Sequence, residues 1–264
     1  MIFAGIDIGS ITAKAALLKQ NSENKSLTLM GTCVIPTGYN PVIAGEKVFS
    51  GLLKKTQTSQ ADVRSIVSTG YGRHSVDFAN KAMTEIICHG AGVYFSHPKA
   101  RGIIDVGGQD SKAIALSTSG QVENFAMNDK CAAGTGRFLE VMANALELKL
   151  DELGPLGLTS QTPAKISSIC TVFAESEVIS MIAAREKRKN IIAGIHDAAA
   201  ARVAGLANKI KIQAPVIMTG GVAKNIGLVK ALENRLGLDI IVAAHAQENG
   251  AIGAAVLAAE KNKN

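Results

Sequence analysis

The sequence predicts an α/β protein whose two halves share one strand-and-loop design. The stretch GIDIGSITAK begins at Gly5, and a close copy, IIDVGGQDSK, begins at Ile103. The copies align without a gap at an offset of 98 residues, so that Asp7 matches Asp105. Segments typical of strands alternate with segments typical of helices in both halves, which predicts a mostly parallel sheet in each. The repeat therefore indicates an internal duplication.

The composition fits this fold class and narrows the function. The chain has 264 residues, of which 47% are hydrophobic and 19% charged, with 26 glycines for tight turns. No apolar run reaches the roughly 18–20 residues that cross a bilayer, so we expect a cytoplasmic protein without a membrane segment. The net charge is +6, and the densest basic run is Arg185 to Lys189. We expect this run to be a solvated face, with an acidic partner surface as the alternative, and we expect no nucleic-acid binding.

Hydrophobic periodicity and turn residues place the elements in order. The first half is predicted to hold strands at 3–9, 13–18 and 27–35, a helix at 41–55, a strand from Val63 and a helix at 75–95. The second half is predicted to hold strands at 102–108, 111–117 and 122–128, helices at 134–147, 171–186 and 190–211, a strand within 214–221, a helix at 223–236, a strand at 238–243 and a helix at 248–260. We expect two lobes of βββαβαβα type. The first is residues 1–98 joined by the C-terminal helix 245–264, and the second is residues 99–244.

The repeated loops have the chemistry of phosphate binding. An Asp-x-Gly turn after a buried strand places a carboxylate at the strand end, and its glycine lets backbone N–H groups approach a phosphate. Two such carboxylates from facing halves can hold hydrated Mg²⁺ over the β and γ phosphates, which makes Asp7 and Asp105 the predicted catalytic pair. Gln109 is expected to orient the attacking water, with a loop hydrogen bond as the alternative. The other predicted phosphate contacts are Gly9, Ser10, Thr12 and Lys14 in the first copy and Gly107, Gly108 and Ser111 in the second, whereas Lys112 is expected to face solvent.

A third loop, MTGGVAKN, completes a nucleotide site. Gly220 and Gly221 would leave a flat surface for adenosine, beside a helix predicted to begin near Ala223. The three-loop pattern resembles the superfamily of actin and hexokinase, which implies a two-lobed ATPase that binds ATP or ADP. A small-molecule kinase or regulatory ATPase stays open as the alternative, with Asp110 or Asp129 as its general base. No segment between residues 36 and 100 resembles a sugar-recognition insert, so we favour hydrolysis.

Two of the four cysteines stand out by their position. Cys131 and Cys170 are each predicted at the N-terminus of a helix, where the helix dipole stabilises a thiolate. A buried apolar role is the alternative for each, and Cys33 and Cys88 are expected to be structural. Two thiolates do not complete a four-cysteine iron–sulfur cluster, but a twofold axis would bring four together.

Several longer stretches closely resemble one family over nearly the whole chain. NDKCAAGTGRFLEVMA, CTVFAESEVIS, STGYGR, IDVGGQDSK and TGGVAKN are similar to the ATP-dependent activators of 2-hydroxyacyl-CoA dehydratases, in the BadF/BadG/BcrA/BcrD ATPase family. The resemblance implies an anaerobic, oxygen-sensitive homodimer with one [4Fe-4S] cluster, held by Cys131 and Cys170 of each subunit. It also implies ATP-driven transfer of an electron from ferredoxin or flavodoxin to a dehydratase. A double-cubane cluster protein or a related CoA-ester reductase is the alternative acceptor.

Overall fold

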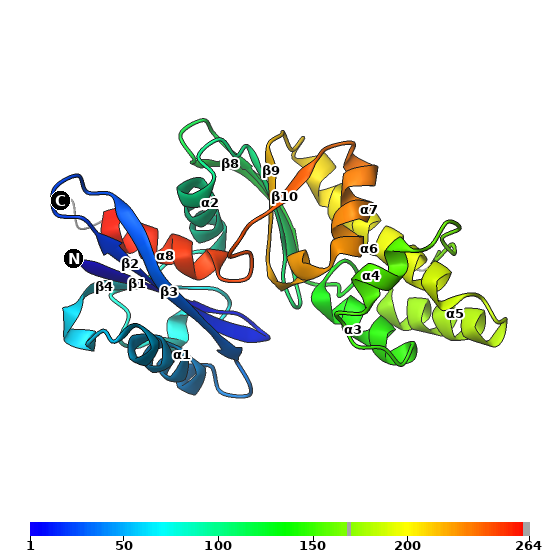
Figure 1. Ribbon diagram of the computed structural model, residues 1–264, viewed down its shortest axis with the longest axis horizontal. Helices are drawn as coiled ribbons and strands as arrows, with labels where there is room; N and C mark the ends of the chain where they lie inside the picture. Colours follow the sequence, from blue (N-terminus) through cyan, green and yellow to red (C-terminus); the bar gives the residue numbers. More distant parts are fainter. Residues whose placement is uncertain (168–169, 261–264) are drawn as a thin grey trace. The chain divides into compact units, whose positions relative to one another are not determined.

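The computed structural model describes residues 1–167 and 170–260, and Figure 1 shows a mixed α/β architecture. Its strands form two five-stranded sheets, in the orders β3-β2-β1-β4-β5 and β10-β9-β6-β7-β8. The first half holds β1 (Ile2–Ile8), β2 (Thr12–Gln20), β3 (Leu27–Pro36), α1 (Pro41–Thr56), β4 (Val63–Thr69), β5 (Lys81–Ala82) and α2 (Glu85–Ser96). The second holds β6 (Gly102–Val106), β7 (Ser111–Leu116), β8 (Val122–Asn128), α3 (Gly136–Ala145), α4 (Leu153–Leu158), α5 (Thr171–Ala183), α6 (Arg188–Lys209), β9 (Val216–Thr219), α7 (Ile226–Leu236), β10 (Ile240–Val242) and α8 (Asn249–Glu260).

The two sheets repeat each other in strand order and in register. In the first, Asp7 pairs with Lys14 across the β1–β2 hairpin, and in the second Asp105 pairs with Lys112 across β6–β7. Read from the hairpin side, the order of the first sheet matches that of the second strand for strand. The predicted duplication is therefore present at the level of individual backbone pairs.

The expectation of mostly parallel sheets was wrong. β1 is antiparallel to β2, and β2 is antiparallel to β3, while β4 is parallel to both β1 and β5. The second sheet likewise combines an antiparallel β6–β7 hairpin with the parallel strands β6, β9 and β10. Strands joined by a short turn must run antiparallel, because a parallel pair needs a crossover of a dozen or more residues.

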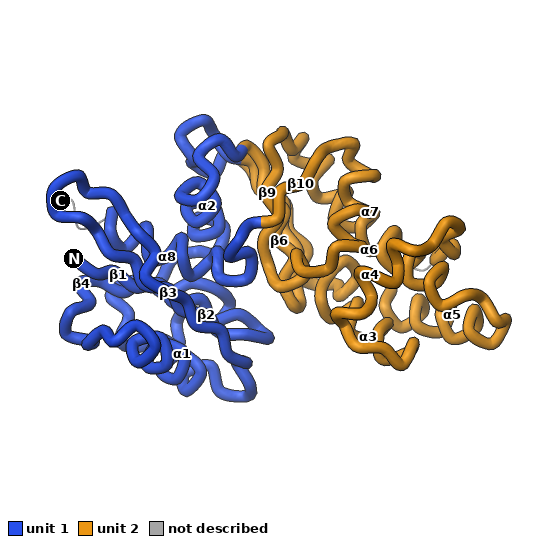
Figure 2. Tube along the Cα trace, viewed as in Figure 1, with its two compact units in different colours: residues 1–100, 116–123, 243–264 blue, residues 101–115, 124–242 orange. Residues whose placement is uncertain are grey.

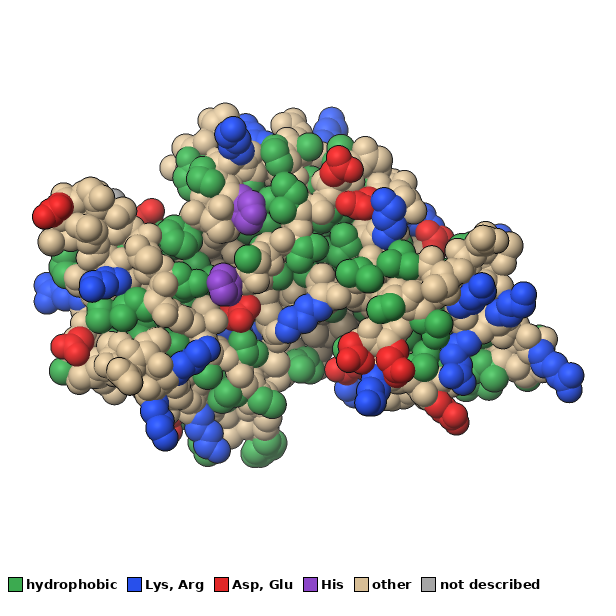
Figure 3. Space-filling model, in the orientation of Figure 1, with side chains coloured by type: hydrophobic (Ala, Val, Ile, Leu, Met, Phe, Trp, Pro, Cys, Tyr) green, Lys and Arg blue, Asp and Glu red, His purple; other side chains and the backbone are tan. Residues whose placement is uncertain are grey.

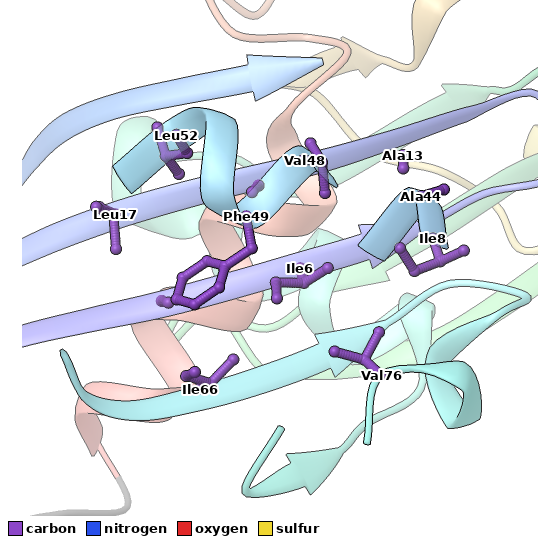
Figure 4. Close-up of a cluster of buried hydrophobic side chains, with 12 residues drawn as sticks. Ile6, Ile8, Ala13, Leu17, Ala44, Val48, Phe49, Leu52, Ile66 and Val76 are labelled. Atoms are coloured by element: carbon purple, nitrogen blue, oxygen red, sulfur yellow. The ribbon is translucent and has the colours of Figure 1, made fainter. Parts of the chain in front are cut away.

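Strand alternation determines what each face of the first sheet buries. Ile6 and Ile8 of β1 point toward Val48 and Phe49 of α1, in the cluster drawn in Figure 4. Phe3, on the other face of β1, packs with residues of α8, and α8 lies beside α2 in Figure 1. Asp7 shares this second face, where its carboxylate lies close to Gly250 of α8.

The helix predicted over 75–95 begins ten residues later than expected. Residues 73–75 form a 3₁₀ turn, and Lys81–Ala82 form the short edge strand β5 beside β4. The Asn80 side chain accepts a hydrogen bond of 2.7 Å from the Ile66 backbone N–H. This pairing with β4 draws the segment into the sheet and delays α2 until Glu85.

The other helices agree with the sequence to within a few residues, and the structure adds α4, which was not predicted. By compactness the chain divides into two units (Figure 2). Unit 1 comprises Met1–Ala100, Leu116–Glu123 and the C-terminal residues from Ala243, and unit 2 comprises Arg101–Ala115 and Asn124–Val242. Among residues 1–167 and 170–260, no helix is long and apolar enough to cross a membrane.

Gly253 is predicted to be essential for the packing of α8 on α2. A Cβ at this position would overlap the Cys88 carbonyl oxygen, which is backbone and cannot rotate away. We expect Gly253→Ala to lower the free energy of unfolding by about 3 kcal/mol, measured by urea denaturation. The control is Gly205→Ala in α6, where an added Cβ meets nothing within 4 Å, and it should be neutral or stabilising by up to about 1 kcal/mol. Equal effects at the two glycines would contradict this account.

We expect His196 to make the free energy of unfolding of unit 2 sensitive to acid. The side chain is buried on α6 against Gly157 and Gly227, its Nε2 has no hydrogen-bond partner, and burial lowers its pKa to about 4. The unfolded chain therefore binds a proton at His196 near pH 6.5, whereas the folded chain binds it only near pH 4. The free energy of unfolding falls by about 3 kcal/mol in total as the pH drops from 6.5 toward 4. His196→Leu should remove that part of the pH dependence of unfolding, whereas His245→Leu, at an exposed position, should leave it intact.

Candidate functional site

The first candidate loop lies at the end of β1 and is tightly folded. Gly9 N–H donates to the Thr12 carbonyl at 3.1 Å, and the Thr37 hydroxyl donates to the Gly9 carbonyl at 2.8 Å. Asp7 is buried, and Lys14 Nζ lies 3.3 Å from its Oδ2. Ser10, at the tip, is exposed. The loop thus presents a compact turn whose carboxylate is held by one lysine.

The second loop repeats this arrangement with an additional acid. Lys112 and Asp105 are each 2% exposed, and Lys112 Nζ lies 3.3 Å from Asp105 Oδ2 and 2.7 Å from Asp110 Oδ2. The Thr219 hydroxyl donates to Asp105 Oδ1 at 2.8 Å. The expectation that Lys112 faces solvent was therefore wrong, because the hairpin register turns its side chain toward Asp105 in the interior. Ser111 is completely buried, and its hydroxyl has no hydrogen-bond partner within the described residues, so its phosphate contact stays a prediction.

The second loop is also fixed to the helix that follows β8. Gly107 N–H donates to the Asp110 carbonyl at 2.9 Å. The Gly107 and Gly108 carbonyls accept from the backbone N–H groups of Gly136 and Arg137, at 2.9 and 2.8 Å. Gln109 is exposed at the tip, where its amide is accessible to a ligand or a water. This end of α3 is therefore bound to the loop by backbone hydrogen bonds.

The third loop follows β9. Gly220 has a φ of +87°, and a Cβ there would collide with the Val106 carbonyl, so only glycine fits. Gly221 is exposed, whereas the Ala223 side chain is buried. The helix predicted to begin near Ala223 begins at Ile226 instead, after a 3₁₀ turn, because Asn225 caps it by accepting from the Leu228 N–H. The surface that remains for a ligand is mainly backbone.

The cysteine segments lie in unit 2 on neighbouring helices. Cys170 is exposed and is the N-cap residue of α5, as predicted, and α5 packs against α3. Cys131 is half-buried, but it lies five residues before α3, so its prediction at a helix start was wrong. The helix cannot extend back to Cys131, because Gly134 has a φ of +81° and Thr135 is extended. The Asn128 side-chain amide donates a hydrogen bond of 2.7 Å to the Cys131 carbonyl.

The other two cysteines have surroundings unlike these. Cys88 is fully buried in α2, and burial raises the pKa of its thiol to about 12. Cys33 is half-buried on β3. Within the described residues, no group of three or more His, Cys, Asp or Glu side chains could hold a metal ion.

Sequence patterns missed the polar network around Asp105, although Asp110 is a residue considered above as the general base of a kinase. Lys112, Asp110 and Thr219 all bond to one another or to the Asp105 carboxylate. A signal for the first was present, since a lysine seven residues after the aspartate occurs in both copies. In a hairpin with a short turn, that spacing places the aspartate and the lysine directly opposite each other on the two strands, so their side chains lie on the same face.

Two duplicated mixed sheets, each with an Asp-x-Gly hairpin, define the class of actin-like ATPases, and the predicted fold class is confirmed. The sequence model of the BadF/BadG/BcrA/BcrD ATPase family matches residues 4–258, and the chain belongs to this family.

Individual relatives match over almost their full length. The activator of lactoyl-CoA dehydratase from Anaerotignum propionicum is 48% identical over 98% of both chains. The (R)-2-hydroxyglutaryl-CoA dehydratase activating ATPase from Acidaminococcus fermentans is 46% identical over 97% of this chain and 96% of its own. The solved activator of the 2-hydroxyisocaproyl-CoA dehydratase from Clostridium difficile, with bound ADPNP, has a TM-score of 0.92 at 43% identity and covers 100% of this chain and 96% of its own.

Lys112 is predicted to be the residue on which the second loop depends. Lys112→Met would leave Asp105 and Asp110 without their shared cation in a buried site, so we expect a loss of about 3–5 kcal/mol in the free energy of unfolding at neutral pH. Lys14→Met removes a single pair that is less buried, at 13% side-chain exposure, and should cost less. Urea denaturation of both variants measures the difference, and a larger loss for Lys14→Met would refute this ranking.

Proposed function

We propose that the chain binds and hydrolyses ATP with the three loops described above. Asp7 and Asp105 would hold a hydrated Mg²⁺ ion, which supplies charge neutralisation at the β and γ phosphates when bound. The backbone of Gly9, Gly107 and Gly108 would approach the phosphates. Support comes from the family, which is one of ATPases, and from the identical hairpin register of the two loops.

The remaining predicted residues divide by their exposure. Ser10 and Gln109 are exposed at the loop tips, where Ser10 would donate to phosphate and Gln109 would orient the attacking water. Thr12 would add a hydroxyl in the first loop. Lys14 would orient the Asp7 carboxylate by the contact already present, and it lies over Gly9, within reach of a phosphate bound there. Gly221 would contact adenosine, with Gly220 and Ala223 shaping that loop.

We further propose that the protein is an ATP-dependent activator of a 2-hydroxyacyl-CoA dehydratase. The observation that carries this proposal is the 48% identity to such an activator along 98% of both chains. The activity would take one electron from ferredoxin or flavodoxin and deliver it to the dehydratase, driven by ATP hydrolysis. A [4Fe-4S] cluster supplies one-electron chemistry of this kind when bound.

The cysteines of unit 2 fit such a cluster. Cys170 is exposed as the N-cap residue of the 13-residue helix α5, where its Sγ would be accessible to iron. Cys131 lies in the segment just before α3, which packs on α5. One chain supplies two thiolates and a cluster takes four, so we propose that two copies related by a twofold axis share one cluster.

The cysteines make the proposal testable without a dehydratase. Protein purified without oxygen should contain about four irons per dimer. Cys131→Ala and Cys170→Ala should each lose this iron and the paramagnetic resonance signal of the reduced protein. Cys33→Ala, on β3, is the matched control and should retain both. The measurements are iron and sulfide content, electron paramagnetic resonance with and without nucleotide, and sedimentation for the dimer.

Other outcomes would separate the two parts of the proposal. A colourless, air-stable protein that phosphorylates a small molecule would reject the activator and leave a kinase. A protein that contains iron after Cys131→Ala and Cys170→Ala are combined would show that the ligands are elsewhere. Iron that depends on these cysteines, with no activation of any 2-hydroxyacyl-CoA dehydratase, would uphold the cofactor and reject the acceptor.

A further inference from the structure

The segment TGYGRH, from Thr69 to His74, follows β4 and has no part in the function proposed above. It occupies the same place in the first sheet as the adenosine loop occupies in the second. Thr69 pairs with Asp7 across the parallel strands β4 and β1, and Thr219 pairs with Asp105 across β9 and β6. The two segments are therefore equivalent positions of the duplication.

The backbone of the two segments is the same in detail. Gly70 has a φ of +85° and Gly220 one of +87°. Arg73 N–H donates to the Gly70 carbonyl at 3.2 Å, and Ala223 N–H donates to the Gly220 carbonyl at 3.2 Å. The next backbone hydrogen bond, from Ser75 N–H to the Gly72 carbonyl in the first copy and from Asn225 N–H to the Val222 carbonyl in the second, has a length of 2.9 Å in both. Arg73 therefore takes the position of Ala223, a residue assigned above to a nucleotide-binding loop.

This segment lies directly against the Asp7 loop. Gly72 N–H donates to the Ile8 carbonyl at 2.8 Å, at the residue where β1 ends and the loop begins. A Cβ on Gly70 would overlap the carboxylate of Asp7. A backbone hydrogen bond thus joins the two loops within unit 1, and Arg73 follows Gly72, whose partner Ile8 precedes the predicted phosphate contact Gly9.

The positive charge of the Arg73 side chain is not required to form the backbone turn in which it lies. Its Nη1 donates to the Gly70 carbonyl at 3.2 Å, and the part of the chain that the structure describes gives it no carboxylate partner. The same backbone turn forms around Ala223, which has no side-chain donor. Lys14, the cation of the Asp7 loop, is already paired with Asp7. An unpaired, half-buried guanidinium beside a phosphate loop indicates an anionic ligand.

We propose that Arg73 binds the terminal phosphate of ATP and thereby distinguishes ATP from ADP. The inference rests on the proposed binding of nucleotide at the Asp7 loop. A planar guanidinium can donate two parallel hydrogen bonds to phosphate oxygens, and it neutralises charge that ADP lacks at this position. Arg73 is in this account a contact to the substrate, and its loss affects ATP more than ADP.

The test compares two nucleotides on the full-length protein, purified without oxygen. Calorimetry gives the dissociation constants of ADP and of the β,γ-imido analogue of ATP. Arg73→Gln should weaken the analogue by about 10- to 100-fold, as expected for one charged hydrogen-bonding contact, and change the affinity for ADP by less than about twofold. Arg73→Lys should restore part of the loss. Arg64→Gln is the matched control. Arg64 is exposed near the start of β4, the strand that precedes the Arg73 segment, and its substitution should change neither dissociation constant.

Each of the following results would overturn the assignment. Equal weakening of both nucleotides in Arg73→Gln would show that the side chain only supports the loop. Unchanged affinities would exclude the phosphate contact, and unchanged affinities with lost activation of a dehydratase would place Arg73 at a partner surface instead. Failure of the unaltered protein to bind either nucleotide would refute the proposed function itself, and with it this inference.

Discussion

Each half of the chain depends on a carboxylate that is buried at the end of a central strand and neutralised by a lysine of the neighbouring strand. A buried carboxylate alone would cost several kcal/mol, so Asp7 and Asp105 are tolerable only because the hairpin register brings Lys14 and Lys112 opposite them. The same register sends alternate residues into the apolar core. The pairing of the two hairpin strands thus determines the position of the carboxylate, the direction of the loop and the packing of the sheet. In the second half Asp110 joins the pair, which makes that site more acidic and less symmetric.

Patterns in the sequence predicted what depends on local geometry. The positions of most strands along the chain and the glycine loop after β9 follow from alternation and turn residues, whereas the antiparallel pairing of neighbouring strands was not predicted. Errors occurred where a tertiary contact overrode the local pattern. Asn80 and β5 pair with β4, so an apparently helical segment lies at a sheet edge. Lys112 was expected to face solvent because lysine usually does, and only the register of two strands reveals its burial. Arg73 could be recognised only after the two halves were compared as backbones.

The duplicated halves differ most between the third and fourth strands. In the first half this connection runs from Thr37 to Asp62 and holds α1, whereas in the second it runs from Asp129 to Pro215 and holds α3 to α6. Both cysteines proposed as ligands lie in this longer connection. Lys and Arg side chains also gather there over the end that carries α5, in agreement with the exposed run from Arg185 to Arg188 (Figure 3). The two sheets share the Asp-x-Gly hairpin, and the main difference between the halves is the set of helices α3 to α6.

The C-terminal helix has a consequence for how the protein is made. α8 is synthesised after all of unit 2, yet it packs on β1, β4 and α2 of unit 1, and its Gly250 lies beside the Asp7 carboxylate. β1 and β4 therefore lack one of their covering layers until residues 249–260 have left the ribosome, and by then every segment of unit 2 has been synthesised. The emergence of α8 thus becomes the step that completes unit 1, and a nascent chain cut short before residue 249 would expose the apolar face that α8 covers.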